Sequence, residues 1–363
     1  PLFSSLLSLV DLYLSSSLSL SFSLSSPPCS HQASGQAGYK QAQILSGHAD
    51  WVYAVAVCAA TGRVITGAYD NTARVWKRGE EGKYVLEQEL EGHHNAVVAV
   101  AVCCQTGSIV TGSWDRTAGV WARVARKEEE AYHLQQTLDG HSGSVTAVAV
   151  CPLSGSVITS SYDKTSRVWT RGTEGGGYVL AQVLEGHVKG VAGVAVCALT
   201  GNIITSSWDK RAFVWEKAEE HFEVGQVLEG HSDCVKTVAV CPRTGRVVTG
   251  SLDTTVMVWD RVEREGKEPI YALIQVLKGH RKDVYGVAVC EKTGDIITGS
   301  ADKTAAVWAK QEKIRPKQVM RGHDSCVTAV AVCQQTGAII TASEDKTARV
   351  WVRRKGDEAQ RSQ

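Results

Sequence analysis

The chain has almost no excess charge of either sign and no long run of apolar residues. Its 39 Lys and Arg nearly match its 38 Asp and Glu, which leaves a net charge of +1. So small a net charge creates no global field that would attract nucleic acid or an anionic membrane. Serine interrupts the Leu-rich stretch 1–26 every few residues, and its apolar runs are too short to span a bilayer. We therefore expect neither nucleic acid nor a membrane among the partners.

Motifs for phosphates, metals and cofactors are also missing. The glycines form no G-x-x-x-x-G-K-[ST] motif and no G-x-G-x-x-G motif after a predicted strand. None of the 11 cysteines lies in a C-x-x-C pair or in a Cys/His set with the spacing of zinc ligands. We therefore predict no metal site, no cofactor-binding site and no cofactor.

The chain does contain one unit that is repeated seven times. In each copy an Asp follows the His of a Gly-His pair by 22 positions and a Trp follows it by 28, as in His48, Asp70 and Trp76. Successive pairs are 43 to 49 residues apart, so a unit of constant length alternates with a connector of variable length. A period of this length indicates a repeat architecture. The Gly-His pairs start at Gly47, Gly92, Gly140, Gly186, Gly230, Gly279 and Gly322.

Each unit predicts four short β-strands. In the third copy these are residues 145–151, 156–160, 165–169 and 178–184, which are rich in Val, Ile and Thr and are separated by turn residues. The first run of each unit is apolar almost throughout and does not alternate, so it predicts a strand buried on both faces. Sheets that stack radially as propeller blades bury both faces, whereas an open one-sided sheet does not. We therefore predict an all-β fold.

These residues resemble the WD40 family, which has Gly-His near the start of the repeat, Ser or Thr four residues before a central Asp, and a Trp at the end of the third strand. The resemblance covers about residues 39–354 and recurs seven times. It implies a seven-bladed β-propeller with four-stranded antiparallel blades. One departure is visible, because only Trp259-Asp260 supplies the family's Trp-Asp pair.

The resemblance also implies a hydrogen-bonded structural tetrad in each blade. The Asp would accept a hydrogen bond from the His imidazole, whose other nitrogen would meet a Thr hydroxyl, and that hydroxyl would meet the indole N–H. A buried Asp needs such partners. His, Asp and a hydroxyl also resemble a nucleophilic triad, but catalytic sites are normally single, so we predict no catalytic residues and no enzyme activity. The tetrads are His48, Thr66, Asp70, Trp76; His93, Thr111, Asp115, Trp121; His141, Thr159, Asp163, Trp169; His187, Thr205, Asp209, Trp215; His231, Thr249, Asp253, Trp259; His280, Thr298, Asp302, Trp308; and His323, Thr341, Asp345, Trp351.

The two ends of the repeat region complement each other. Residues 39–45 (YKQAQIL) match the fourth-strand segments at 84–90, 132–138 and 178–184, although they precede the first Gly-His. The last repeat has a third strand that ends at Trp351 but no fourth strand after it. We therefore predict that the N-terminal strand completes the last blade, which closes the ring and removes an open sheet edge.

Two terminal segments lie outside the predicted propeller. The segment 1–38 has no Lys or Arg and does not resemble a secretory signal. Alternating Leu and Ser is what a CT-repeat nucleotide tract encodes, so we predict a disordered or non-native leader, with a degraded targeting peptide as the alternative. Finding peptides from residues 1–26 in a peptide map of the native protein would contradict a non-native origin. We predict residues 355–363 to be a disordered tail.

Seven of the 11 cysteines recur at the end of the first strand of each repeat. Equivalent positions in different blades are too far apart for a disulfide. We interpret them as small buried residues of a protein in a reducing compartment, and we predict the cytoplasm, with the nucleus as the alternative. They are Cys58, Cys103, Cys151, Cys197, Cys241, Cys290 and Cys333.

The predicted strand order brings two loops of each blade to the same face. These are the loop that enters the first strand (the d–a loop) and the turn between the second and third strands (the b–c turn). Three positions per repeat point to this face: the third and fifth residues after the His and the residue before the Asp. Aromatic residues gather there in the first four repeats, and Trp and Tyr commonly anchor interfaces. The candidate partner-binding residues are Trp51, Tyr53, Tyr69, Trp114, Tyr162, Trp208, Lys236, Asp283, Tyr285 and Glu344.

We therefore predict a monomeric, non-enzymatic scaffold that binds a protein or peptide partner on this face. One alternative is an adaptor for ubiquitin or a ubiquitin ligase, because residues 111–121 (TGSWDRTAGVW) and 205–215 (TSSWDKRAFVW) look like blades of the phospholipase-A2-activating-protein family, which binds ubiquitin. The other alternative is a propeller hydrolase, which would require a unique acid/base or nucleophile set that the sequence does not offer.

Overall fold

The computed structural model describes residues 38–126, 129–172, 176–219, 221–265, 267–309 and 314–354. The predicted tail and all but the last residue of the predicted leader lie outside this part of the chain. The regular elements of the described residues are 28 β-strands, β1 to β28. Within the same residues, no helix is long and apolar enough to cross a membrane.

The strands form seven four-stranded antiparallel sheets. The innermost strands are β2 (Val52–Val57), β6 (Val97–Val102), β10 (Val145–Val150), β14 (Val191–Val196), β18 (Val235–Val240), β22 (Val284–Val289) and β26 (Val327–Val332). The second strands are β3 (Val64–Ala68), β7 (Ile109–Ser113), β11 (Val157–Ser161), β15 (Ile203–Ser207), β19 (Val247–Ser251), β23 (Ile296–Ser300) and β27 (Ile339–Ser343). The third strands are β4 (Ala73–Arg78), β8 (Ala118–Arg126), β12 (Ser166–Arg171), β16 (Ala212–Ala218), β20 (Val256–Arg264), β24 (Thr304–Ala309) and β28 (Ala348–Arg353). The outermost strands are β5 (Tyr84–Leu90), β9 (Glu129–Leu138), β13 (Tyr178–Leu184), β17 (His221–Leu228), β21 (Lys267–Leu277), β25 (Arg315–Arg321) and β1 (Tyr39–Leu45).

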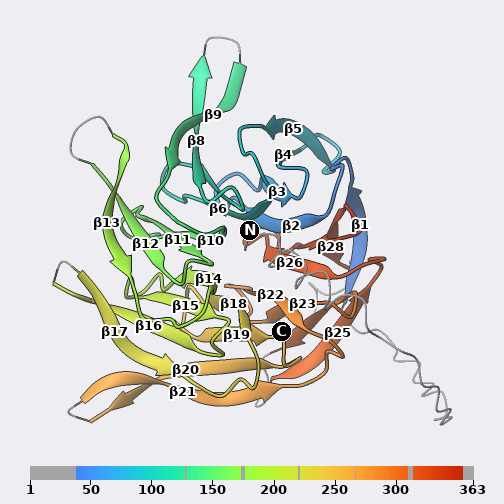
Figure 1. Ribbon diagram of the computed structural model, residues 1–363. Helices are drawn as coiled ribbons and strands as arrows, with labels where there is room; N and C mark the ends of the chain where they lie inside the picture. The colour runs from blue at the N-terminus through green and yellow to red at the C-terminus, as the bar shows by residue number, and fades with distance from the viewer. Residues whose placement is uncertain are drawn as a thin grey trace, which may run out of the picture. The chain divides into compact units, whose positions relative to one another are not determined.

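The sheets are blades of a ring, and we number them in chain order from blade 1 (β2–β5) to blade 7. Each innermost strand contacts the innermost strands of its two neighbours, and β26 contacts β2, which closes the circle. In Figure 1 the innermost strands surround the centre while β5, β9, β13, β17 and β21 lie at the periphery. The predicted seven-bladed propeller is therefore confirmed.

The N-terminal strand closes the ring as predicted. The seventh sheet has the order β1-β28-β27-β26, so β1 is the outermost strand of the last blade. Its register pairs Tyr39 with Arg353 and Leu45 with Ala348. Gly38, the last residue of the predicted leader, accepts a hydrogen bond from the Arg354 amide at 2.8 Å. The two ends of the repeat region are thus held together by one β-ladder.

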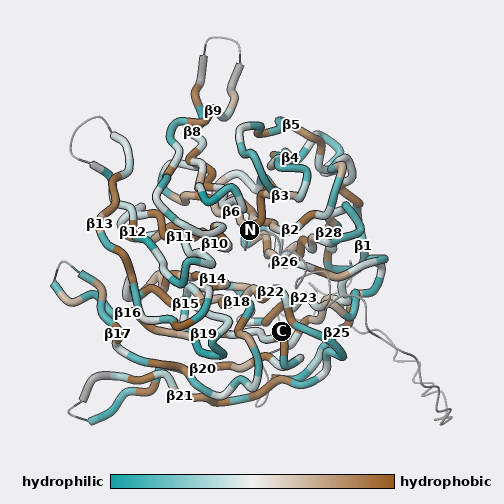
Figure 2. Tube along the Cα trace, viewed as in Figure 1, coloured by the Kyte–Doolittle hydropathy of each residue, from teal (hydrophilic) through white to brown (hydrophobic). Residues whose placement is uncertain are grey.

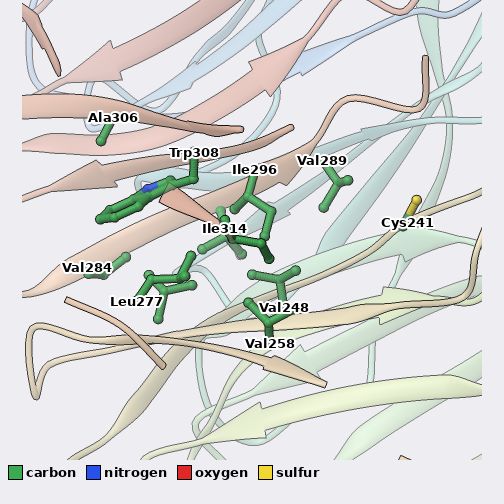
Figure 3. Packing of buried hydrophobic residues seen from close by; sticks show 12 residues of the cluster. Cys241, Val248, Val258, Leu277, Val284, Val289, Ile296, Ala306, Trp308 and Ile314 are labelled. Atoms are coloured by element: carbon green, nitrogen blue, oxygen red, sulfur yellow. The ribbon is translucent and has the colours of Figure 1, made fainter. Parts of the chain in front are cut away.

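The core lies between neighbouring blades. In Figure 3, Val248 and Val258 of blade 5 pack with Ile296 and Trp308 of blade 6. Hydrophobic stretches are visible on strands such as β13 and β20 in Figure 2. Because burial of apolar area drives folding, each blade depends on its neighbours for its core.

One expectation about burial was wrong. The second strands, not the first, are buried along their whole length, as in Val64–Ala68. The innermost strand of blade 1 is buried at Val52 and Ala54 and only partly buried at Val55, Ala56 and Val57. An innermost strand is the inner edge of its sheet and has no strand beyond it, so its side chains stay partly accessible from that edge even where its faces pack against neighbouring blades.

Candidate partner-binding face

A chain of hydrogen bonds links four side chains in each blade. The His Nδ1 lies 2.7–2.9 Å from an Asp Oδ2, and the His Nε2 lies 2.6–2.9 Å from a Thr Oγ1. The Trp indole N–H donates to the same Thr Oγ1 over 2.8–3.1 Å. In a neutral His, Nδ1–H donates to the carboxylate and Nε2 accepts from the Thr hydroxyl. The sets of residues are the 28 that the family resemblance implies.

The Asp of each tetrad joins the d–a loop to the b–c turn. In blade 1, Asp70 Oδ2 accepts from the Ala49 amide at 2.9 Å as well as from His48, while Oδ1 accepts from the Thr72 amide and hydroxyl. Burial by itself would raise the pKa of Asp70, but these hydrogen bonds, the one from His48 first, lower the pKa well below its usual value. The Thr hydroxyl is engaged on both sides, so the arrangement positions loops and does not present a nucleophile.

The two loops of each blade are joined by a backbone hydrogen bond. The amide of the residue before the Asp donates to the carbonyl of the third residue after the His, at 2.8 Å between Tyr69 and Trp51 and at 3.1 Å between Glu344 and Cys326. The same bond is present in the five other blades. Side chains at these positions therefore emerge side by side.

Four aromatic side chains form a cluster over blades 1 and 2, which we call the aromatic cluster. It consists of Trp51, Tyr53, Tyr69 and Trp114. Ring centroids are 5.7 Å apart for Trp51 and Tyr69, and 5.2 Å apart for Tyr69 and Trp114, which meet edge to face. Trp51 is 36% exposed, and the other three side chains are half-buried. The cluster packs one blade against the next and still presents aromatic surface to solvent.

A second aromatic pair links blades 3 and 4. Tyr162 is 39% exposed and lies edge to face with the half-buried Trp208 at 6.0 Å. Among the described residues, the buried Nε1 of Trp208 has no hydrogen-bond partner.

The remaining candidate residues bring charge to this face. Tyr285 Oη lies 3.5 Å from Asp283 Oδ2, and burial raises the pKa of Asp283. Glu344 accepts from the Ser325 hydroxyl at 3.0 Å. Burial raises the pKa of Tyr53, and the negative charge of Glu344 in blade 7 raises it further. Lys236 is half-buried.

The comparisons with known proteins agree with this geometry. A family model described as "WD domain, G-beta repeat" matches residues 39–77, 84–122, 132–170, 178–216, 222–260, 271–309 and 314–352. The chain belongs to the WD40 family. WD40 propellers typically serve as protein-interaction scaffolds and are generally non-catalytic. None of the curated proteins matches the chain.

A solved WD40 structure supports the same fold. The crystal structure of the WD40 beta propeller domain of Doa1 superposes with a TM-score of 0.72 and is 24% identical in sequence. The similarity covers 88% of this chain and 98% of the Doa1 domain. At this level of identity the similarity shows the fold.

The sequence argument missed a link between WD40 blades. A Gln side chain on each outermost strand exchanges two hydrogen bonds with the backbone at or just before the next outer strand, as Gln88 does with Tyr132 at 2.7 Å in both directions. Gln318 makes the same exchange with Tyr39 across the closure. The signal was available, because Gln follows the Tyr of the matching segments by four positions in 39–45, 84–90, 132–138 and 178–184.

The sequence argument also missed a pocket beside the tetrad of blade 2. It has a volume of about 150 Å³, and its lining includes the exposed Gly92 and His94 of the d–a loop. Asp115, Gly119, Trp121, Leu134 and Thr137 also line the pocket. The signal was a glycine two positions before the strand-ending Trp, where six other repeats carry a side chain.

Proposed function

We propose that the protein is a non-enzymatic scaffold that binds a peptide or protein segment on the face of the d–a loops and b–c turns. The observation that carries this proposal is the aromatic cluster of Trp51, Tyr53, Tyr69 and Trp114 with its partly exposed rings. Large aromatic side chains that keep one surface in water supply much of the binding energy of protein interfaces. Asp283 and Glu344 add negative charge to the same face.

The basic residues of this face have a different explanation. Arg116, Lys164, Lys210, Lys303 and Lys346 directly follow the tetrad Asp, and all five have positive φ angles between 67° and 76°. Lys210 and Lys346 donate to loop carbonyls of the adjacent blades, at Ser232 and Ala49. They belong to tight turns, so they do not favour a reader of phosphorylated peptides.

The second candidate function is an adaptor for ubiquitin. It is favoured by the blade sequences at 111–121 and 205–215, which resemble the ubiquitin-binding phospholipase-A2-activating-protein family.

We extend the proposal to a monomer in the cytoplasm, with the nucleus as the alternative. The ten described cysteines are free thiols, as a reducing compartment requires.

The test compares wild-type protein with the triple variant Trp51→Ala, Trp114→Ala, Trp208→Ala in affinity capture from cell lysate and in a titration with ubiquitin. Thermal melting checks that each protein is folded. A matched control is Leu153→Ala with Leu199→Ala, which removes apolar side chains that are 57% and 56% exposed in the a–b turns on the opposite face.

We expect the folded triple variant to lose partners that the control retains. Loss of ubiquitin binding in the same comparison would favour the adaptor. If all partners stay bound to the folded triple variant, the proposed face is wrong.

A further inference from the structure

Blade 2 lacks a side chain that three other blades place over the glycine of the Gly-His pair. The position two before the strand-ending Trp is Arg74 in blade 1, Arg167 in blade 3 and Arg349 in blade 7, but Gly119 in blade 2. The guanidinium of Arg74 lies so close to Gly47 that a Cβ there would collide with it. The corresponding space is therefore suited to a guanidinium in this scaffold.

The other two arginines show the same placement. A Cβ on Gly140 would come within 2.5 Å of Arg167 Nη1, and one on Gly322 would come within 2.6 Å of Arg349 Nη1. In blade 2 the atoms nearest to a Cβ on Gly92 belong instead to the rings and methyls of the pocket wall, which are 3.3 Å away or more. The guanidinium position is open in blade 2.

Carboxylates contact two of these three guanidinium groups. Arg349 Nη2 lies 3.6 Å from Oδ2 of the tetrad residue Asp345. Arg74 Nη2 lies 2.9 Å from Glu89 Oε2, and Glu89 is the register partner of Arg74 on the outermost strand. A tetrad Asp can therefore attract a guanidinium while it keeps its hydrogen bonds to the loop and the His.

Blade 2 retains the features that such a group would contact. Asp115 lines the pocket and makes the usual tetrad bonds. Trp121 and Leu134 supply an apolar wall for an alkyl stem. The volume of about 150 Å³ is enough for a planar group of the size of benzene.

Two of the three remaining blades cover the same space with a large apolar side chain. Phe213 stacks on His187 in blade 4 with ring centroids 4.0 Å apart. Met257 Sδ would lie 3.1 Å from a Cβ on Gly230 in blade 5. In blade 6 the corresponding residue is Ala306, and the ring of the tetrad residue Trp308, the counterpart of Trp121, would come within 2.9 Å of a Cβ on Gly279.

The side chain of His93 is accordingly the most exposed of the seven tetrad histidines, at 6% against 1–3%. Blade 2 thus differs from its neighbours in the access that it gives to its tetrad.

We propose that the blade 2 pocket binds the guanidinium of an arginine side chain from the protein partner, in the position that Arg74, Arg167 and Arg349 occupy in their own blades. The lining residues Gly92 and His94 are exposed and belong to the d–a loop of blade 2, and d–a loops form the face that the proposed function uses. The inference rests on that function for the source of the arginine. One residue of the partner that contacts this face would therefore be an arginine.

The experiment titrates the full chain with N-acetyl-arginine N-methylamide and follows the Trp121 indole N–H and the Gly119 amide by NMR. The lysine and citrulline analogues serve as comparisons, because the first carries the charge without the planar fork and the second is neutral and nearly isosteric. We expect saturable shifts with the arginine probe and at least tenfold weaker binding of the other two. Equal binding of all three, or no saturable shift, would overturn the inference.

Two variants sharpen the test. Gly119→Arg should fill the pocket from within and abolish probe binding, but its Cβ would lie 2.9 Å from Thr111 Oγ1 and from Trp121 Nε1, so the tetrad must shift to accept it. If this variant does not fold, the probe binding of Thr137→Glu tests the inference. Thr137 is exposed and is the register partner of Gly119, as Glu89 is of Arg74. Thr137→Glu should tighten probe binding by about threefold, the size of an exposed ion pair. Its control is Val183→Glu opposite Arg167, which should leave binding unchanged.

Unchanged binding in Thr137→Glu, or retained binding in a folded Gly119→Arg, contradicts the inference. Loss of partners in the triple Trp variant without any binding of the arginine probe would overturn only this inference. If the folded triple Trp variant keeps its partners while the arginine probe binds to the pocket, the proposed face is wrong and the inference about the pocket still holds.

Discussion

The tetrad residues are the same in all seven blades, whereas the residues on the face above them differ from blade to blade. Every blade has the same His, Asp, Thr and Trp with hydrogen bonds that differ by no more than 0.3 Å between blades, 2.6–2.9 Å for His to Thr and 2.8–3.1 Å for Trp to Thr. On the face, the residue before the Asp is aromatic in blades 1 to 4 and is Leu252, Ala301 and Glu344 in blades 5 to 7.

The difference shows how a repeat protein separates stability from recognition. The shared residues have the same structural role in all blades, because each tetrad joins two loops and supplies hydrogen-bond partners for a buried carboxylate. The varied residues extend from identical backbone positions, held by the same amide-to-carbonyl bond. Function is therefore expected where the repeats differ, and the following predictions test that separation.

The largest effect is expected from deletion of residues 39–46. The deletion removes β1, leaves the β28 edge unpaired and breaks the Gln318–Tyr39 link. Because all seven blades share one closed ring, the expected loss is on the order of 5 kcal/mol or more, comparable with the stability of a whole domain. Thermal unfolding measures it, and a synthetic peptide of residues 38–46 should restore part of the melting temperature. An unchanged melt would refute the closure.

A smaller effect is expected from Trp169→Ala, which removes a buried tetrad side chain. Loss of its packing and of its bond to Thr159 should lower the free energy of unfolding by about 3–5 kcal/mol. The matched variant on the face, Trp51→Ala, should cost less than about 1 kcal/mol, because Trp51 is partly exposed and its indole packs in the aromatic cluster. Urea unfolding compares the two. Equal costs would mean that the aromatic cluster is part of the core.

The smallest effect is the pH dependence of the free energy of unfolding, and its sign differs between a tetrad residue, Asp70, and a residue of the face, Asp283. The pKa of Asp70 is lowered by folding, so its stabilisation is present above the unfolded pKa of about 3.9 and is lost as the pH falls toward the folded value. The pKa of Asp283 is raised by folding, so its contribution declines as the pH rises from about 3.9 to the folded value.

Urea midpoints of Asp283→Asn and wild type, measured at pH 4 and pH 7, report the Asp283 contribution. We expect the variant to gain stability relative to wild type as the pH rises. A relative loss over this range would show that the carboxylate of Asp283 is stabilised in the fold.

Sequence reasoning succeeded where one blade contains the whole pattern. The spacing of His48, Asp70 and Trp76 is local to a repeat, so it predicted both the strands and the residues that the tetrad brings together. The closure was also predicted, because residues 39–45 are a fourth strand without a preceding third strand. The same reasoning was wrong about Val55–Val57, because the apolar run does not reveal that its strand lies at the inner edge of a sheet.

The features that sequence reasoning missed are those that two strands or two blades create together. Gln88 and Tyr132 are 44 residues apart and meet only because neighbouring outer strands lie side by side. The pocket at Gly119 exists because Leu134 and Trp121 do not cover the space that an arginine fills elsewhere.

By itself, the sequence determined the number of blades, the composition of each and the strand that closes the ring. These follow from the periodic positions of apolar, turn and tetrad residues, because each repeat contains the full pattern in its own sequence. Only the tertiary structure decided which aromatic rings touch, how much of Trp51 and Tyr162 stays exposed and where a cavity opens beside a tetrad. Those outcomes depend on the packing of neighbouring side chains at distances of a few ångströms, and no spacing along the chain encodes them.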